Sequence, residues 1–216
     1  MRNFPLSLLA ASVLMAGVPA LAAPAPTNLG VNIIVNGDAE SGPGAPSDGL
    51  PLMTIPGWQR SGNFEVTQYG ASGGFPELTD PGPTDRGKNF FNGGPDNPKS
   101  SATQTDRIVG LDSEIDGHQL AFDFSAYIGG YSNQNDHCTI TAVFESKSGK
   151  ALGSAKLGPV MAADRQDKTG LFARSTTGAV PAGTRAVSIT MTIVRTDGAF
   201  NDGCADNLSL VLKKKA

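Results

Sequence analysis

Four segments of this chain alternate apolar and polar residues with a period of two, and this alternation restricts the fold more than any other feature. The segments are 118–128, 138–144, 185–195 and 207–212. In the first of them Leu120, Phe122 and Phe124 share one face. Such a period, with one polar face, is typical of antiparallel strands that pack a single face against a core.

Weaker alternation occurs at 31–35, 63–69, 87–92, 100–108, 150–157 and 170–176. The 27 glycines and 15 prolines gather between such segments, in turn-rich stretches such as 42–51 and 70–87. No stretch keeps a helical period beyond two turns. We therefore predict an all-β fold, a two-sheet antiparallel jelly-roll β-sandwich of about ten strands.

The N-terminal residues have the pattern of a secretory signal peptide. Arg2 precedes a short apolar run, and Ala20-Leu21-Ala22 fits a small-residue cleavage site. The run is short for a membrane span, although an N-terminal anchor is the alternative. We predict a signal peptide over 1–22, one domain over 23–216, and a secreted or periplasmic protein without a membrane span.

The charge balance indicates no nucleic-acid partner. The chain carries 20 acidic and 17 basic side chains, so nothing resembles the basic surface that phosphate backbones require.

The chain has two cysteines, Cys138 and Cys204, each behind an Asn-Asp pair at the start of a predicted strand. Cys138 lies two residues before Ile140, and Cys204 lies four residues before Leu208. By strand alternation both cysteines should therefore point toward the core. An exported chain with two such cysteines is expected to form one disulfide, and two buried free thiols are the alternative.

A disulfide between these cysteines would bring the loops 129–136 and 196–202 to one end of the sandwich. Together the loops offer amides, carboxylates and two aromatic rings, which suit the hydroxyls and the apolar face of a sugar. The predicted ligand residues are Tyr131, Asn133, Asn135, Asp136, Phe200, Asn201 and Asp202. Alternatively, these residues only make tight turns. Trp58, the single tryptophan, is the rival platform.

Three short motifs are spread along the chain. The first is Asn36-Gly37 with Glu40 and Gly42. Pro56 and Trp58 form the second, and the segment 206–210 (Asp-Asn-Leu-Ser-Leu) forms the third. Together they resemble the motifs of the galactose-binding-like jelly rolls, which include carbohydrate-binding modules of secreted bacterial proteins, although Ala39 stands where those domains usually have Phe. The similarity extends over about residues 30–212.

The resemblance implies a structural calcium site where the first and last segments of such domains meet. By position, Glu40 and Asp206 would supply the side-chain ligands, and backbone carbonyls would supply the rest. The alternative is a carboxylate that accepts backbone N–H groups at a turn.

The sequence shows no set of catalytic residues. His118 and His137 are the only histidines, too few for a zinc site, and neither stands near a nucleophile motif. We therefore expect a secreted, non-catalytic carbohydrate-binding module. The alternative is an extracellular structural or adhesive matrix protein, and a polysaccharide-active enzyme is the third hypothesis.

Overall fold

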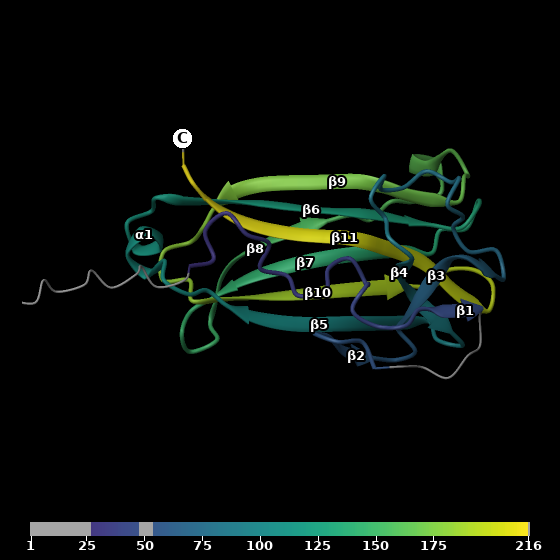
Figure 1. Ribbon diagram of the computed structural model, residues 1–216, viewed down its shortest axis with the longest axis horizontal. Coiled ribbons are helices and arrows are strands. Elements are labelled where there is room, and N and C mark those ends of the chain that lie inside the picture. Colours follow the sequence, from purple (N-terminus) through teal and green to yellow (C-terminus); the bar gives the residue numbers. More distant parts are fainter. Residues whose placement is uncertain (1–26, 48–53, 216) are drawn as a thin grey trace, which may run out of the picture.

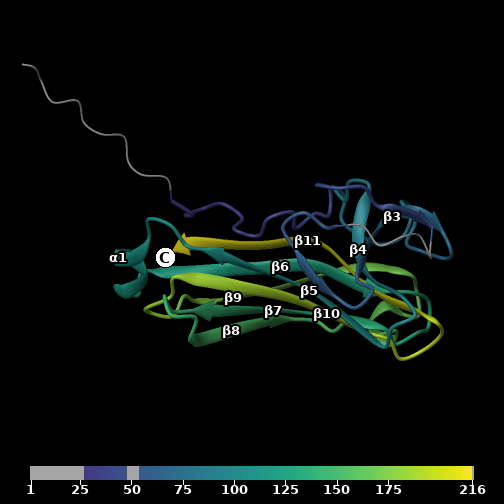
Figure 2. The ribbon, with the colours of Figure 1, turned by 90° about the horizontal axis from the view of Figure 1, so that it is seen from below.

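A computed structural model describes residues 27–47 and 54–215. They form two stacked β-sheets, with β11, β6 and β9 in one layer and β5, β10, β7 and β8 in the other (Figure 2). The fold is the all-β jelly-roll sandwich that the alternating segments predict. The signal peptide predicted over 1–22 lies outside the described residues.

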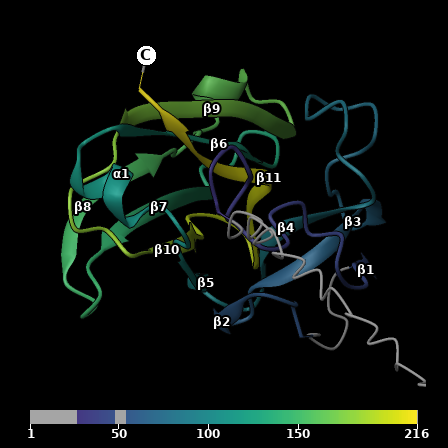
Figure 3. The ribbon, with the colours of Figure 1, turned by 60° about the vertical axis from the view of Figure 1, so that its left-hand side comes forward.

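The larger sheet has six strands in the order β1-β3-β4-β11-β6-β9 (Figure 1). Their bounds are Ala45–Ser47 for β1, Glu65–Ser72 for β3, Asn89–Pro95 for β4, Phe200–Lys214 for β11, Leu120–Gly130 for β6 and Gly170–Ala179 for β9. All neighbours are antiparallel except β1, which lies parallel to β3. Strands β1, β3 and β4 stand to one side of the sandwich (Figure 3).

The smaller sheet has five antiparallel strands in the order β2-β5-β10-β7-β8. Their bounds are Gln59–Ser61 for β2, Lys99–Arg107 for β5, Ala186–Val194 for β10, His137–Glu145 for β7 and Ala151–Leu157 for β8. A short helix, α1 (Asp112–Asp116), connects β5 to β6 at the left-hand end in Figure 1.

The core lies between the two sheets and is built from alternate residues of each strand. In β10, Val187, Ile189, Met191 and Ile193 are all fully buried. Aromatic rings contact each other across the gap: Phe122 of β6 and Phe144 of β7 have ring centroids 4.9 Å apart. The outward residues of the smaller sheet are polar, as where Thr103 pairs with Thr190 and Thr190 with Thr141.

A second, smaller apolar cluster is separate from the main core. Its buried members are Tyr69, Ala71, Phe75, Phe90, Leu171 and Cys204. Phe75 belongs to the segment between β3 and β4, which reaches Leu171 of β9 through a hydrogen bond from the Leu171 N–H to the Pro81 carbonyl at 2.8 Å. The long turn-rich segment 70–87 thus contributes to the packing of the larger sheet.

The structure departs from the predicted strands at three places. Residues 31–35 form no strand; they make an isolated bridge and hydrogen bonds beside β11, such as the one from the Ile33 N–H to the Leu210 carbonyl at 3.0 Å, and Val35 bonds to Gln104 of β5. Strands β1 and β2 are three residues each, too short to show a period. β11 begins at Phe200, within the predicted loop 196–202.

Candidate functional site

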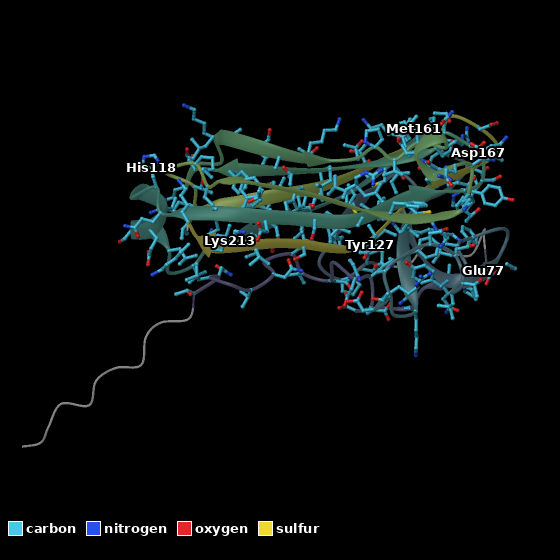
Figure 4. All side chains as sticks on the ribbon, turned by 90° about the horizontal axis from the view of Figure 1, so that it is seen from above. Glu77, His118, Tyr127, Met161, Asp167 and Lys213 are labelled. Carbon is cyan, nitrogen blue, oxygen red and sulfur yellow. The ribbon has the colours of Figure 1, made fainter. Side chains whose placement is uncertain are left out.

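Loops of both sheets gather at one end of the sandwich, opposite α1, and we call this end the rim. It consists of residues 73–88, 131–136, 158–169 and 195–199, together with the first residues of β11. Figure 4 shows Glu77, Met161 and Asp167 at this end and His118 at the other. The rim contains all seven predicted ligand residues.

Asp136 connects the loops of the rim. Its carboxylate is fully buried. Oδ1 accepts hydrogen bonds from the backbone N–H groups of Thr196 and Asp197, at 2.6 and 3.0 Å, and from Thr196 Oγ1 at 3.1 Å. Oδ2 accepts one from the Asp202 N–H at 2.9 Å. The two loops therefore meet through one carboxylate, and the role of Asp136 is to hold the rim from beneath rather than to contact a ligand.

Arg165 supports the rim from the β8–β9 side. It lies in a short 3-10 helix, Ala163–Arg165, and is 1% exposed. Its guanidinium donates to the carbonyls of Ser132 and Gln134, both at 2.8 Å, and to that of Lys168. Burial lowers the pKa of the guanidinium. Arg165 Nε is also buried and has no hydrogen-bond partner among the described residues.

The backbone around Arg165 is strained. Ser132, Gln166 and Asp167 have φ values of 42°, 54° and 56°, in the left-handed region that favours glycine. Such conformations persist only where surrounding contacts impose them. Here Arg165 binds the Ser132 carbonyl, and the N–H groups of Gln166 and Asp167 bond to the carbonyls of Ala163 and Ala162. The loop 131–136 is thereby held in one shape.

Tyr131, Asn133 and Asn135 are the predicted ligand residues that the rim exposes. Tyr131 is 36% exposed. Its ring lies against the backbone of Gly74, which has a φ of +90°. A side chain at this position would place its Cβ only 3.0 Å from the ring. Only glycine allows this contact, so the segment 73–88 supports the ring from one side.

The predicted residues at the start of β11 are less accessible. Asn201 is fully buried and donates to the Ile193 carbonyl at 3.2 Å, so its predicted contact with a ligand is wrong for this fold. Phe200 is half-buried and packs edge-on against Phe75, with ring centroids 5.1 Å apart. Asp202 is half-buried, and its pKa is raised to about 7, first by desolvation and then by the Asp136 charge.

The predicted disulfide is not formed: Cys138 and Cys204 are both buried free thiols. A β-bulge between Asp206 and Ser209, with Asn207 at a φ of 48°, explains the error. The bulge reverses the alternation, so Cys204 belongs to the second cluster while Cys138 belongs to the main core. Counting back from Leu208 without the bulge places Cys204 on the wrong face.

Trp58 is interior. It is 7% exposed, its ring packs edge-on against Phe91 at 5.6 Å, and its Nε1 donates to the Asn36 carbonyl at 3.1 Å. The alternative hypothesis, that the Trp58 ring stacks on a sugar ligand, is therefore wrong.

Glu40 and Asp206, the predicted calcium ligands, lie close together at a second site, which we call the junction. It joins the segment 36–42 to β3, β4 and β11. Asp206 is fully buried; its Oδ2 accepts from Tyr69 Oη at 2.7 Å and its Oδ1 from the Asn207 N–H at 2.7 Å. The exposed Glu40 accepts at Oε1 from the N–H groups of Lys88 and Asn89, at 2.8 and 2.7 Å.

The junction has an excess of negative charge. Burial raises the pKa of Asp206 to about 8, and the nearby charges of Glu40 and Asp38 add to the rise, although the Tyr69 and Asn207 hydrogen bonds oppose it. The Asp206 carboxylate also raises the pKa of Tyr69, after the effect of burial. A hard cation with oxygen ligands fits this donor set, because it would offset the charge. Within the described residues, no group of three or more His, Cys, Asp or Glu side chains suits a metal ion, so backbone carbonyls would have to complete the shell.

Sequence reasoning missed Arg165 and Tyr69. Arg165 stands in a loop with no motif, and the strained residues around it are not glycines, so nothing in the sequence signals them. Tyr69 has no signal either, since Phe64 and Val66 set the inward phase of the predicted strand 63–69 and Tyr69 falls on the opposite phase.

No protein-family model matches the sequence, and no curated protein matches it. Among solved structures, the enzymatically active domain of tailspike protein 4 from bacteriophage CBA120 is similar, with a TM-score of 0.53 and 15% identity. The match covers 86% of this chain but only 23% of the tailspike structure. At this identity the likeness shows a shared fold and nothing about activity.

Several similar structures are carbohydrate-binding modules. A family 16 module matches with a TM-score of 0.46 and 17% identity, over 83% of this chain and 99% of that module. TmCBM61, solved in complex with β-1,4-galactotriose, matches with a TM-score of 0.46 and 14% identity, over 85% of this chain and 99% of that one. Across residues 27–47 and 54–215, no helix is long and apolar enough to cross a membrane.

Proposed function

We propose that the protein is a secreted, non-catalytic carbohydrate-binding module whose ligand surface is the rim. The observation that carries the proposal is Tyr131, a partly exposed ring that is supported by Gly74 and lies in a loop that also exposes Asn133 and Asn135. An aromatic ring beside amides suits a sugar, because the ring stacks on the apolar face while the amides bond hydroxyls.

The rigidity of the rim supports this proposal. Asp136 and Arg165 hold the loop 131–136 through hydrogen bonds from both sides. A loop that is already ordered loses little conformational entropy when it binds, so a small contact surface retains more of its binding free energy. Turn-forming residues alone need no such support from beneath.

A glycan array of the purified protein tests the proposal, followed by titration of the best ligand into variants. Tyr131→Ala should abolish measurable binding and leave the melting temperature nearly unchanged, because a partly exposed ring contributes little to folding. Leu78→Ala is the matched control, since Leu78 is 64% exposed in the neighbouring rim segment. Phe200→Ala is unsuitable, because Phe200 packs in the second cluster.

Two outcomes would contradict the proposal. Saturable sugar binding that survives Tyr131→Ala would move the ligand surface away from the rim. The absence of sugar binding, together with self-association of the protein, would favour the extracellular structural or adhesive role instead.

We also propose that calcium binds at the junction through Glu40 and Asp206, with backbone carbonyls as further ligands. Its role would be structural, joining the segment 36–42 to β11. The raised pKa of the buried Asp206 beside Glu40 supports this, because a cation would relieve both burial and repulsion. The alternative is that Asp206 is sufficiently stabilised by Tyr69 and the Asn207 N–H.

A further inference from the structure

A cavity of about 320 Å³ lies beside β5, and none of its lining residues belongs to the rim or the junction. It is lined by Val35, Gly57, Gln59 of β2 and the segment Thr103–Asp106 of β5. β2 pairs with β5 only as far as Thr103, so no strand of the described residues pairs with this β5 edge beyond Thr103. The volume is near the lower end for small-molecule sites, and it suits a ligand of about one sugar unit.

The walls of the cavity are fixed by hydrogen bonds. Gln104 accepts at Oε1 from the Val35 N–H at 2.8 Å and donates from Nε2 to the Val35 carbonyl at 3.0 Å. The hydroxyls of Thr103 and Thr105 are bonded to Thr190 and Ser188 of β10, at 3.0 and 2.7 Å. The cavity therefore has a defined shape without a ligand, and its lining is mostly uncharged.

Among residues 27–47 and 54–215, Asp106 is the single charged residue in this lining, and its carboxylate forms no salt bridge there. One of its oxygens, Oδ2, is buried without a hydrogen-bond partner among the described residues. Desolvation alone raises its pKa, to about 6, so at neutral pH the group is mostly ionised. The neighbouring Arg107 alternates to the opposite face of β5 and lines a different cavity.

The chemistry of this lining selects its ligand. A carboxylate in a partly desolvated site is best matched by a cationic donor, because a charge-assisted hydrogen bond offsets the cost of burial. The amide of Gln59 and the backbone of the unpaired β5 edge suit hydroxyl groups. Val35, which is 53% exposed, offers an apolar contact at the entrance.

We propose that this cavity binds a small hydroxylated ammonium ligand, such as an amino sugar, with Asp106 as the partner of the ammonium group. The site is separate from the rim, so it does not depend on the sugar binding proposed there. Its test uses other residues, and either proposal can fail while the other holds.

The experiment is calorimetric titration of the protein with glucosamine, and in parallel with N-acetylglucosamine and glucose, which lack the positive charge. Glucosamine should bind saturably and at least about tenfold more tightly than either neutral sugar. Trp58 gives a second readout, because its neighbours Gly57 and Gln59 both line the cavity and it is the one tryptophan in the sequence. Its fluorescence should change with the same saturation curve.

Asp106→Asn should weaken glucosamine binding at least about tenfold while the protein melts at the same or a higher temperature, since a buried charge is removed. Gln59→Phe should also block binding by filling the cavity; Gln59 is exposed, so folding should be preserved. The matched control is Asp96→Asn, which removes one exposed charge at a left-handed position (φ 52°) that asparagine tolerates.

Equal affinity for glucosamine and N-acetylglucosamine would overturn the proposal, as would no binding of glucosamine by the unmodified protein. Unchanged affinity in Asp106→Asn would overturn it too, because the ammonium group would then have another partner.

Discussion

The rim and the junction each contain a fully buried aspartate, and the two sites treat it differently. Asp136 at the rim accepts four hydrogen bonds, three of them from backbone N–H groups. Asp206 at the junction accepts two, and it lies near the charges of Glu40 and Asp38. Burial of a carboxylate therefore does not by itself indicate a metal site, because the number of hydrogen-bond donors around the carboxylate decides whether a cation is needed to offset its charge.

Of the changes that distinguish the rim from the junction, we expect Asp136→Ala to have the largest effect on stability. It leaves the N–H groups of Thr196, Asp197 and Asp202 without their acceptor and should lower the free energy of unfolding by about 2–4 kcal/mol. Chemical denaturation measures this, with Asp197→Ala, an exposed change on the same loop, as the control. A loss below about 1 kcal/mol would show that Asp136 does not hold the rim together.

The next effect concerns calcium and the junction. Because calcium would bind only the folded protein, saturating calcium should raise the melting temperature by about 5–10 °C, and a chelator should reverse the change. Asp206→Asn should remove this response without a large loss of stability in chelator, since a carboxyl group with a pKa of about 8 is already mostly neutral at about pH 7. Glu114→Gln, in the helix at the opposite end, should keep the calcium response. If calcium does not change the melting temperature, the alternative holds, in which Asp206 is stabilised by its hydrogen bonds from Tyr69 and Asn207 alone.

The third effect is a pH dependence that should sharpen the comparison. The pKa values of Asp106, Asp202 and Asp206 are raised to about 6, 7 and 8, so between about pH 4 and 8 the folded state binds more protons than the unfolded state. Stability therefore falls as pH rises through this window. Denaturation in chelator at about pH 5, 7 and 9 should show the decline, and Asp206→Asn should remove its upper part. Stability that rises across this range would contradict the raised values.

The sequence predicted correctly those features that depend on residues close together in the chain. The segments 118–128, 138–144 and 185–195 correspond to β6, β7 and β10 within two residues at each end. The alternation of side chains is a property of each strand, so it can be read without knowing the partner strand. The predicted gathering of the loops 129–136 and 196–202 at one end is also confirmed, although Asp136 joins them and a disulfide does not.

The remaining features depend on tertiary structure. The bulge after Asp206 turns Cys204 away from the core, and it arises from the pairing of β11 with β6. Arg165 becomes a rim residue only because three carbonyls from two loops converge on it, and Asp106 faces a cavity because β2 ends before reaching it. The sequence by itself determined the strands and most of their inward faces, because side-chain alternation acts within a few residues. Tertiary structure decided which polar groups are buried together and which lack partners, because those contacts join residues far apart in the chain.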